Sequence, residues 1–180
     1  MKQFYMLVIV AIAYTSTANA QKREFNQNFE SLDAGKNITK LQKGKFVTWG
    51  KSTWTVTEEE GKGFNNSNKY ASSGDEVGST LVQYRNLEVG ATYVFSVAVK
   101  MTNVGKQAWK GNYTVHISSG EKGDVHSYGK EKIIEPKANI WEKHELEFTV
   151  IEGRERVIFN VYRWAKDVIL NADDFKLVKK

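Results

Sequence analysis

The stretch Leu87-Glu-Val-Gly-Ala-Thr-Tyr-Val-Phe-Ser-Val-Ala-Val-Lys-Met101 decides the fold class of this chain. After a turn marked by Gly90, large apolar side chains occupy every second position, and a period of two is typical of a β-strand. These positions are Tyr93, Phe95, Val97, Val99 and Met101. The alternate positions are smaller and more polar, which indicates a strand with one face in a core and the other toward a groove or solvent.

The same period recurs along the rest of the chain, which predicts more strands of this kind. It is found in residues 53–57, 113–117, 144–150, 157–161 and 175–177. No segment keeps a period of 3.6 residues, and polar segments at 58–68, 102–112 and 118–130 read as loops at the ends of a sandwich. We therefore predict an all-β fold, an antiparallel β-sandwich.

The N-terminus reads as a secretory signal peptide. Lys2 precedes an apolar run over residues 4–14, and Ala18-Asn-Ala20 supplies the small residues that a signal peptidase accepts. The run is too short to span a bilayer. We expect a signal peptide of residues 1–20 and one domain of residues 21–180. The mature protein is expected to be secreted or periplasmic, with no membrane contact after cleavage. The lack of cysteine indicates a bacterial exported protein.

The amino-acid composition excludes several kinds of functional site. The chain has no cysteine, so disulfides, thiolate zinc sites and cysteine nucleophiles are excluded. Its formal net charge is +5, but the lysines are scattered among acids and form no dense basic run. This distribution argues against nucleic acid as a partner and leaves acidic polysaccharide open.

Several short motifs resemble those of jelly-roll carbohydrate-binding modules, in particular families four, nine and twenty-two (CenC-type). In chain order they are Asn28-Phe-Glu30, the segment 66–74, the segment 87–93, Trp141 ahead of Phe148-Thr-Val150, and Asp173-Asp-Phe-Lys-Leu177. The resemblance spans essentially the whole chain after residue 20. It implies a jelly roll of the galactose-binding-domain-like type that is secreted, is not catalytic, and binds a polysaccharide or oligosaccharide through exposed aromatic side chains.

Carboxylates near the two ends of the domain suggest a structural calcium. In folds of this kind the first and last strands lie side by side, so Glu30, Asp173 and Asp174 would converge, and a cation would relieve their repulsion. The resembling modules commonly carry calcium at this place. The alternative is that the two aspartates cap the last strand and that Glu30 is solvated.

Exposed aromatic rings are the natural contacts for a sugar, because the C–H groups of a pyranose face meet the negative face of an indole or phenol ring. Trp109 lies in a polar loop, and Trp164 follows Tyr162 in a phase opposite to the core of its strand. Trp49, beside Gly50, is a third candidate. Each tryptophan could instead cover an edge of the core.

Polar side chains must complete such a site, because sugar hydroxyls are fixed sets of donors and acceptors. The predicted outward-facing candidates are Gln83, Arg85, Lys100, His116, Asn160 and Arg163. Asn160 and His116 are the sharper choices, since they alternate with apolar residues on strands that read as central.

Two other functions stay open. A secreted jelly-roll polysaccharide lyase or glycoside hydrolase would need a carboxylate pair or a proton-transferring group such as His126, Tyr128 and Arg163. The histidines have no zinc-binding spacing, and no nucleophile-elbow motif occurs. The third possibility is an extracellular adhesion or partner-binding module.

Overall fold

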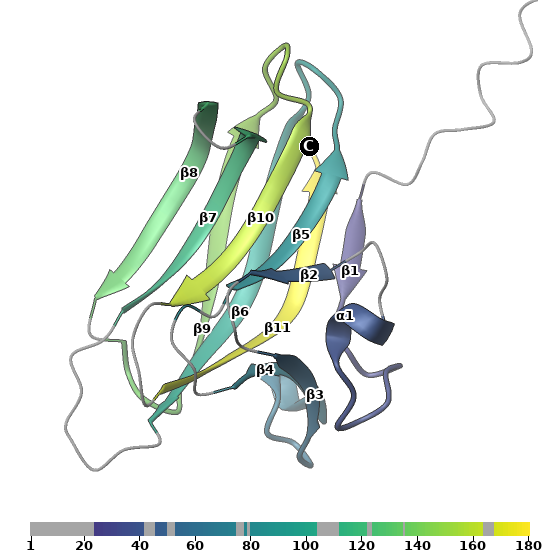
Figure 1. The fold of residues 1–180 in the computed structure, drawn as a ribbon, viewed down its shortest axis with the longest axis vertical. Helices are drawn as coiled ribbons and strands as arrows, with labels where there is room; N and C mark the ends of the chain where they lie inside the picture. The colour runs from purple at the N-terminus through teal and green to yellow at the C-terminus, as the bar shows by residue number, and fades with distance from the viewer. Residues whose placement is uncertain are drawn as a thin grey trace, which may run out of the picture.

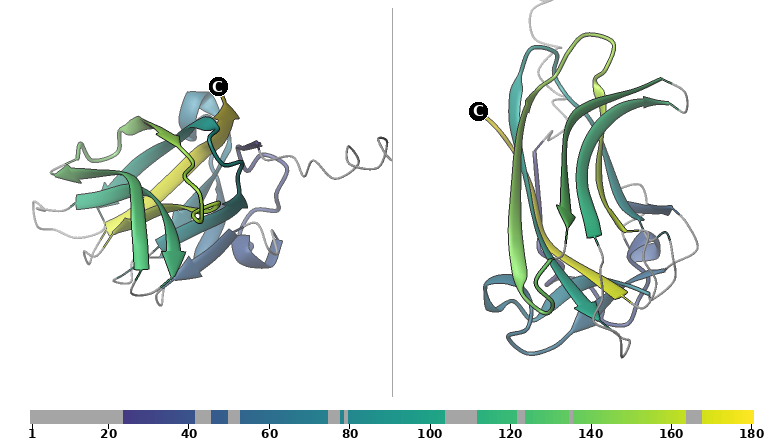
Figure 2. Two further views of the ribbon diagram at one scale, coloured as in Figure 1. Left: turned by 90° about the horizontal axis from the view of Figure 1, so that it is seen from above. Right: turned by 90° about the vertical axis from the view of Figure 1, so that its left-hand side faces the viewer.

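The computed structural model describes residues 24–41, 46–49, 53–74, 78, 80–103, 112–121, 124–134, 136–163 and 168–180. These residues form two antiparallel β-sheets packed face to face (Figures 1 and 2). The fold is therefore an all-β sandwich, as the period of two predicts.

The strands of the larger sheet are β1 (Phe25–Gln27), β3 (Trp54–Glu58), β4 (Lys69–Ser73), β6 (Thr92–Asn103), β9 (Trp141–Thr149) and β11 (Val168–Lys179). Its order is β3-β4-β11-β6-β9, and β1 also pairs with β11. The two short strands pair with different parts of β11, because β1 lies opposite residues 175–177 and β4 opposite residues 171–172. We call this sheet the six-stranded sheet.

The strands of the smaller sheet are β2 (Phe46–Trp49), β5 (Thr80–Asn86), β7 (Asn112–Glu121), β8 (Asp124–Ile134) and β10 (Arg156–Arg163). Its order is β2-β5-β10-β7-β8, so β10 is central. We call it the five-stranded sheet. Two one-turn helices, α1 (Ile38–Leu41) and η1 (Phe64–Asn66), lie in the connections, and neither has the length that a transmembrane helix requires.

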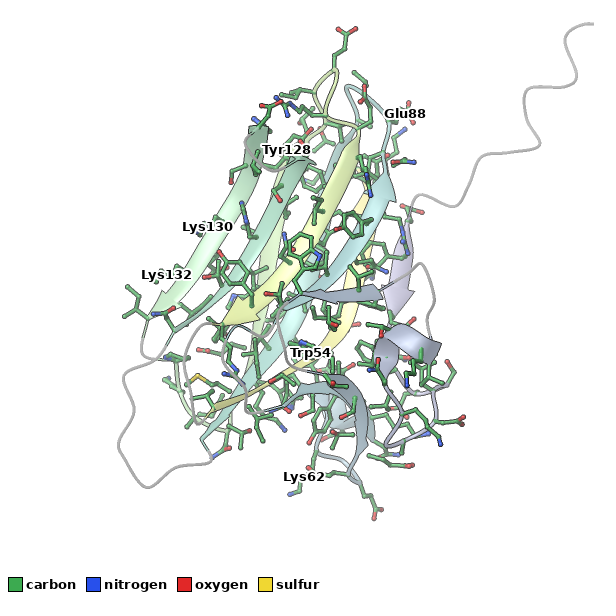
Figure 3. All side chains as sticks on the ribbon, in the orientation of Figure 1. Trp54, Lys62, Glu88, Tyr128, Lys130 and Lys132 are labelled. Atoms are coloured by element: carbon green, nitrogen blue, oxygen red, sulfur yellow. The ribbon has the colours of Figure 1, made fainter. Side chains whose placement is uncertain are left out.

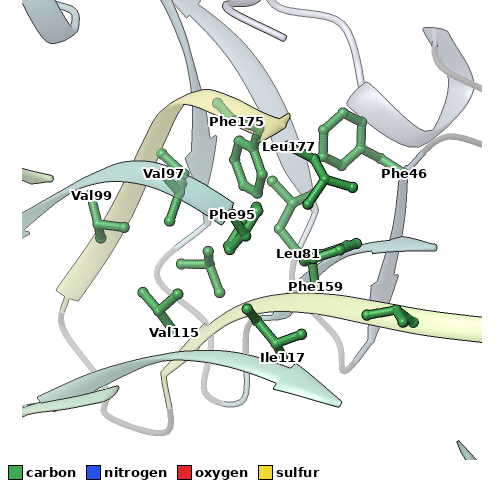
Figure 4. Close-up of a cluster of buried hydrophobic side chains, with 14 of the residues drawn as sticks. Phe46, Leu81, Phe95, Val97, Val99, Val115, Ile117, Phe159, Phe175 and Leu177 are labelled. Carbon is green, nitrogen blue, oxygen red and sulfur yellow. The ribbon is translucent and has the colours of Figure 1, made fainter. Parts of the chain in front are cut away.

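Aromatic rings from both sheets fill the space between them (Figure 4). Phe95 of β6 and Phe159 of β10 have ring centroids 4.7 Å apart, which joins an interior strand of one sheet to the central strand of the other. Phe175 of β11 makes an edge contact with Phe46 of β2 at 5.4 Å. All four rings are almost completely buried. Such rings combine a large buried area with favourable edge and tilted contacts.

The core phases predicted from the sequence are confirmed. Tyr93, Phe95, Val97, Val99 and Met101 are all buried, and so are the apolar positions of the segments 113–117 and 157–161. The expectation that residues 118–130 form a loop is wrong, because β7 continues to Glu121 and β8 begins at Asp124. β8 is an edge strand of its sheet. Because an edge strand with a solvent-exposed face carries many polar residues, its sequence resembles that of a loop.

Replacing Phe95 by alanine tests the role of the contact between the sheets. Phe95 is completely buried, so its truncation should lower the free energy of unfolding by about 3–5 kcal/mol. Ile134→Ala is the control, since Ile134 is largely exposed and should change stability by less than about 0.5 kcal/mol. Chemical denaturation of both variants measures the difference. Equal losses would contradict the assignment of the core.

Candidate functional site

Alternate side chains of the five-stranded sheet point away from the core, and we call this side of the sheet the outer face. Its edges are exposed, whereas Val82, Thr80 and Thr114 near its centre are buried. Phe159 and Val161 of β10 belong to the core, so the alternate residues Asn160 and Tyr162 point outward. Cross-strand neighbours share a face, and two rows of them run across all five strands. The rows are Val47, Val82, Asn160, His116 and Lys130, and Trp49, Thr80, Tyr162, Thr114 and Lys132.

Asn160 occupies the centre of the outer face and has an unsatisfied acceptor. Its side chain is 4% exposed, and its Oδ1 has no hydrogen-bond partner among the described residues. A buried carbonyl oxygen without a donor costs free energy on the order of 1–3 kcal/mol. A ligand hydroxyl at this position would supply the missing donor.

His116 lies next to Asn160 in the first row and can exchange hydrogen bonds with a neutral ligand. Its Nε2 is 3.0 Å from Oγ of Ser127. Burial lowers the pKa of His116, and the charge of Lys130 lowers that pKa further. The imidazole is therefore uncharged at neutral pH.

Aromatic rings lie on the β2 side of the outer face. Trp49 is 44% exposed, and its ring centroid is 6.3 Å from that of Tyr84 in an edge arrangement. The guanidinium of Arg156 lies 5.0 Å from the centroid of Tyr84. Trp49 therefore offers an exposed indole surface that Tyr84 supports from the side. The sequence alone leaves Tyr84 ambiguous, because this residue shares its phase with the apolar Val82.

The outer face is positively charged. Lys130 and Lys132 extend from β8 (Figure 3), and Arg156 lies at the opposite end of β10 from Tyr162. The described positions of this face include no aspartate or glutamate. Glu131, which lies between the two lysines in the sequence, points to the other side of the strand and contacts His144. Three permanent cations therefore surround a neutral polar centre.

Three of the predicted binding residues do not lie on the outer face. Gln83 and Arg85 pair with the core residues Phe159 and Val157, so they point between the sheets. Arg163 shares the phase of Phe159, is completely buried, and donates from Nη2 to the carbonyl oxygen of Gly74 at 2.6 Å. Their predicted outward orientation is wrong.

The remaining predicted binding residues divide into three groups. Trp49, Tyr162, Asn160 and His116 come together on the outer face, while Trp109 and Trp164 lie outside the described residues. Lys100 is on the outside of the six-stranded sheet, between the rings of Tyr70 and Trp141 at 4.6 Å from each centroid. It also donates to the carbonyl oxygen of Lys62, so this lysine anchors the loop after β3.

The two predicted carboxylate ligands Glu30 and Asp173 bind the same loop. Oε1 of Glu30 accepts from the backbone N–H groups of Asn68 and Lys69, at 2.7 and 2.9 Å. Oδ2 of Asp173 accepts from Ser67 Oγ at 2.6 Å and from the N–H of Phe64 at 3.1 Å. Both carboxylates thus hold the connection between β3 and β4 against the end of the sandwich.

These contacts engage carboxylate oxygens that the predicted calcium site would need. The described residues contain no group of three acidic or histidine side chains that could hold a metal ion, so Glu30, Asp173 and Asp174 do not form one cluster. Asp173 has its Oδ1 engaged as well, by the N–H of Asp174 at 2.8 Å. Calcium binding at this end of the sandwich stays a prediction.

The proton-transfer group considered from the sequence is not assembled. Tyr128 donates to the carbonyl oxygen of Arg154 and packs its ring against His126, whereas Arg163 pairs with Tyr113 at the far end of β10. Tyr113 does contact a histidine, with its Oη 2.7 Å from Nε2 of His144. Tyr113 is completely buried, and burial raises its pKa, so this pair joins the two sheets and offers no reactive group to a substrate.

Comparison with known proteins identifies the class of fold. The CBM22-1 xylan-binding domain of Xyn10C from Paenibacillus barcinonensis matches with a TM-score of 0.60 and 11% identity, covering 86% of this chain and 92% of that domain. TmCBM61 in complex with β-1,4-galactotriose matches with a TM-score of 0.55 and 14% identity, covering 81% of this chain and 99% of that one. Both are carbohydrate-binding modules, and this chain spans nearly their whole length.

A larger protein contains the same fold as one part. The CBM22-1-GH10 modules of xylanase 10B from Clostridium thermocellum, complexed with xylohexaose, match with a TM-score of 0.61 and 14% identity over 87% of this chain and 28% of that one. No protein-family model matches the sequence, and no curated protein matches it. The structural likeness shows that this chain has a jelly-roll β-sandwich fold, and the expected fold is confirmed.

The pKa of Asp173 gives a prediction that separates the loop anchor from a metal site. Burial is the largest influence and raises this pKa from 3.8 to about 6, although three hydrogen bonds oppose it. Protonation of Asp173 stabilises the folded state, because the folded-state pKa is above the unfolded one. This contribution is fully present below pH 3.8 and is lost as the pH rises through about 6. We expect the unfolding free energy to rise by about 1 kcal/mol between pH 7 and pH 5, and Asp173→Asn to remove this rise.

Thermal unfolding across that pH range, with and without chelator, checks the prediction. With the carboxylates bound to loop N–H groups, chelator should leave Tm unchanged. A fall in Tm on chelation, together with lower stability at pH 5, would contradict the loop-anchor account and establish a stabilising cation.

Proposed function

We propose that this protein is a secreted, non-catalytic module that binds a polysaccharide on the outer face of the five-stranded sheet. The observation that carries the proposal is the buried Oδ1 of Asn160, which lacks a donor in the described structure and lies on the same face as the exposed ring of Trp49. A sugar presents both complements, because its hydroxyls donate hydrogen bonds and its C–H face packs on an aromatic ring. The fold shared with xylan-binding and galactotriose-binding modules supports this class of ligand.

The charge of the outer face favours an acidic polysaccharide. Lys130, Lys132 and Arg156 flank the neutral centre formed by Asn160 and His116. Uronic acid groups along a glycan would meet these cations while its hydroxyls meet the centre. A signal peptide over residues 1–20, which lie outside the described residues, fits a protein that meets polysaccharide outside the cell.

Truncation of the outer face should weaken binding without unfolding the domain. Trp49→Ala removes an exposed ring, and a hot-spot aromatic contributes on the order of 2 kcal/mol, so the affinity should fall by about tenfold or more. Asn160→Ala should weaken binding by a similar factor, because the hydroxyl loses its acceptor. Affinity electrophoresis through gels of xylan, β-glucan, alginate, agar and pectin identifies the ligand, and calorimetry on that ligand gives the affinities.

Ile140→Ala is the matched control, since it also removes an exposed apolar side chain but lies outside the outer face. Trp109→Ala and Trp164→Ala extend the test to the two tryptophans outside the described residues. Unchanged affinity in both Trp49→Ala and Asn160→Ala would reject the outer face. Release of reducing ends from any gel polysaccharide would favour the enzyme, and partner binding without sugar binding would favour the adhesion module.

The proposed charge preference predicts a salt effect. Retention on an acidic gel should fall as NaCl rises from about 0.05 to about 0.5 M, because the interaction between exposed charges is screened. The double variant Lys130→Gln, Lys132→Gln should be retained less and should show a smaller salt effect. Lys36→Gln, Lys137→Gln removes the same charge from exposed positions elsewhere. Equal retention of both double variants would contradict the role of the outer face in charge recognition.

A further inference from the structure

The side chains of strand β5 alternate between the outer face and the space between the sheets. Gln83 and Arg85 point inward near the edge where β1 joins β11. There they line a pocket of about 530 Å³ together with Phe25, Asn26, Gln27 and Lys176. We call this the side pocket. Its volume is in the range of small-molecule sites, about 300–1,000 Å³.

The side pocket contains a half-buried guanidinium with no carboxylate partner among the described residues. Arg85 lies with its Cζ 4.8 Å from the ring centroid of Phe25 and donates from Nη1 to the carbonyl oxygen of Tyr84 at 2.8 Å. Burial lowers the pKa of Arg85. Guanidinium has five N–H donors, and removing such a charge from water is costly unless an anion compensates. Of these donors, the described contacts engage one.

The acid at the pocket makes no ion pair with Arg85 in the described part of the chain. Glu24 lines the side pocket, and its Oε1 accepts from the backbone N–H of Lys179 at 2.9 Å. Lys176 adds a second positive charge at an exposed position of the wall. Two cations and one carboxylate therefore line the pocket, and this positive balance favours an anion.

A ligand in the side pocket would also need to donate a hydrogen bond to Gln83. Its side chain is 1% exposed, and its Oε1 has no partner in the described part of the chain. Gln83 and Arg85 are two residues apart on one strand, so their side chains are neighbours on the same face. A ligand that satisfies both must carry an anionic group and a hydroxyl close together.

We propose that the side pocket is a second binding site, which takes a carboxylate-bearing sugar such as a uronic acid. Arg85 binds the carboxylate through its planar fork of donors, and Gln83 accepts a hydrogen bond from an adjacent hydroxyl. Lys176 strengthens the attraction for the anion. The side pocket and the outer face, which carries Trp49 and Asn160, lie on opposite sides of the five-stranded sheet. The proposal for the side pocket therefore does not depend on polysaccharide binding at the outer face.

Titration of the isotope-labelled full chain with sodium glucuronate at constant ionic strength tests the side pocket. We expect the side-chain amide signals of Gln83 to shift, and a dissociation constant in the range of about 1–10 mM, which is ordinary for one monosaccharide. Glucose, which has the hydroxyls but no carboxylate, should bind at least about tenfold more weakly. Acetate, which has the carboxylate alone, should also bind more weakly.

Variants assign the binding to this pocket. Arg85→Gln should reduce glucuronate affinity by about tenfold or more, which corresponds to the loss of a charge-assisted hydrogen-bonded pair. Lys176→Glu places a negative charge on an exposed wall position, so it should weaken glucuronate binding without affecting folding. This second variant keeps the test valid if Arg85→Gln lowers Tm. Arg154→Gln is the matched control, because that guanidinium is already paired with Asp124 at 2.7 Å.

The outcomes separate this proposal from the outer-face proposal. If glucuronate binds to Trp49→Ala and Asn160→Ala as to the parent, but not to Arg85→Gln, the side pocket stands whether or not the outer face binds a polysaccharide. The proposal is overturned if glucuronate causes no shift at Gln83, or if Lys176→Glu binds it like the parent. Acetate or a peptide C-terminus binding as tightly as glucuronate would overturn the assignment to a sugar.

Discussion

The contact between Phe95 and Phe159 is the interaction on which the rest of this structure depends. It joins the interior strand β6 of one sheet to the central strand β10 of the other, and it fixes which face of each strand is inside. Once Phe159 is in the core, strand geometry sends Asn160 to the opposite face. Because Asn160 pairs with Val82 on one side and His116 on the other, the outer face follows from the same constraint.

The two proposed sites share one physical signature, a buried amide oxygen without a donor. Buried polar atoms in folded proteins are nearly always paired, so an exception calls for a cause. Asn160 shows the exception on the outer face and Gln83 shows it in the side pocket. In both places positive side chains outnumber negative ones among the described residues, which suits acidic sugars better than neutral ones. The opposite end of the sandwich differs, since the carboxylates of Glu30 and Asp173 there are well supplied with N–H donors.

Sequence analysis predicts the fold class and the core phases correctly, because burial of alternate large apolar residues leaves a strong period of two. It does not predict which face of β5 is inside. Val82 is apolar and buried although it has the phase of the outer face, while the polar Gln83 and Arg85 point inward, so the polarity of these residues does not identify the inward phase. The correct phase depends on pairing with Phe159 and Val157, which a single strand does not reveal. The engagement of Asp173 with Ser67 likewise depends on a loop conformation that residue spacing does not encode.

The shift of the Asn160 side-chain amide signals on titration with a short acidic oligosaccharide tests the central claim most directly. We expect these signals to shift together with backbone amides of β2, β5, β7 and β10, since the ligand hydroxyl meets the unsatisfied Oδ1 of Asn160 at the centre of the outer face. Unchanged Asn160 signals, with shifts confined to the six-stranded sheet, would contradict the claim that this face binds the polysaccharide.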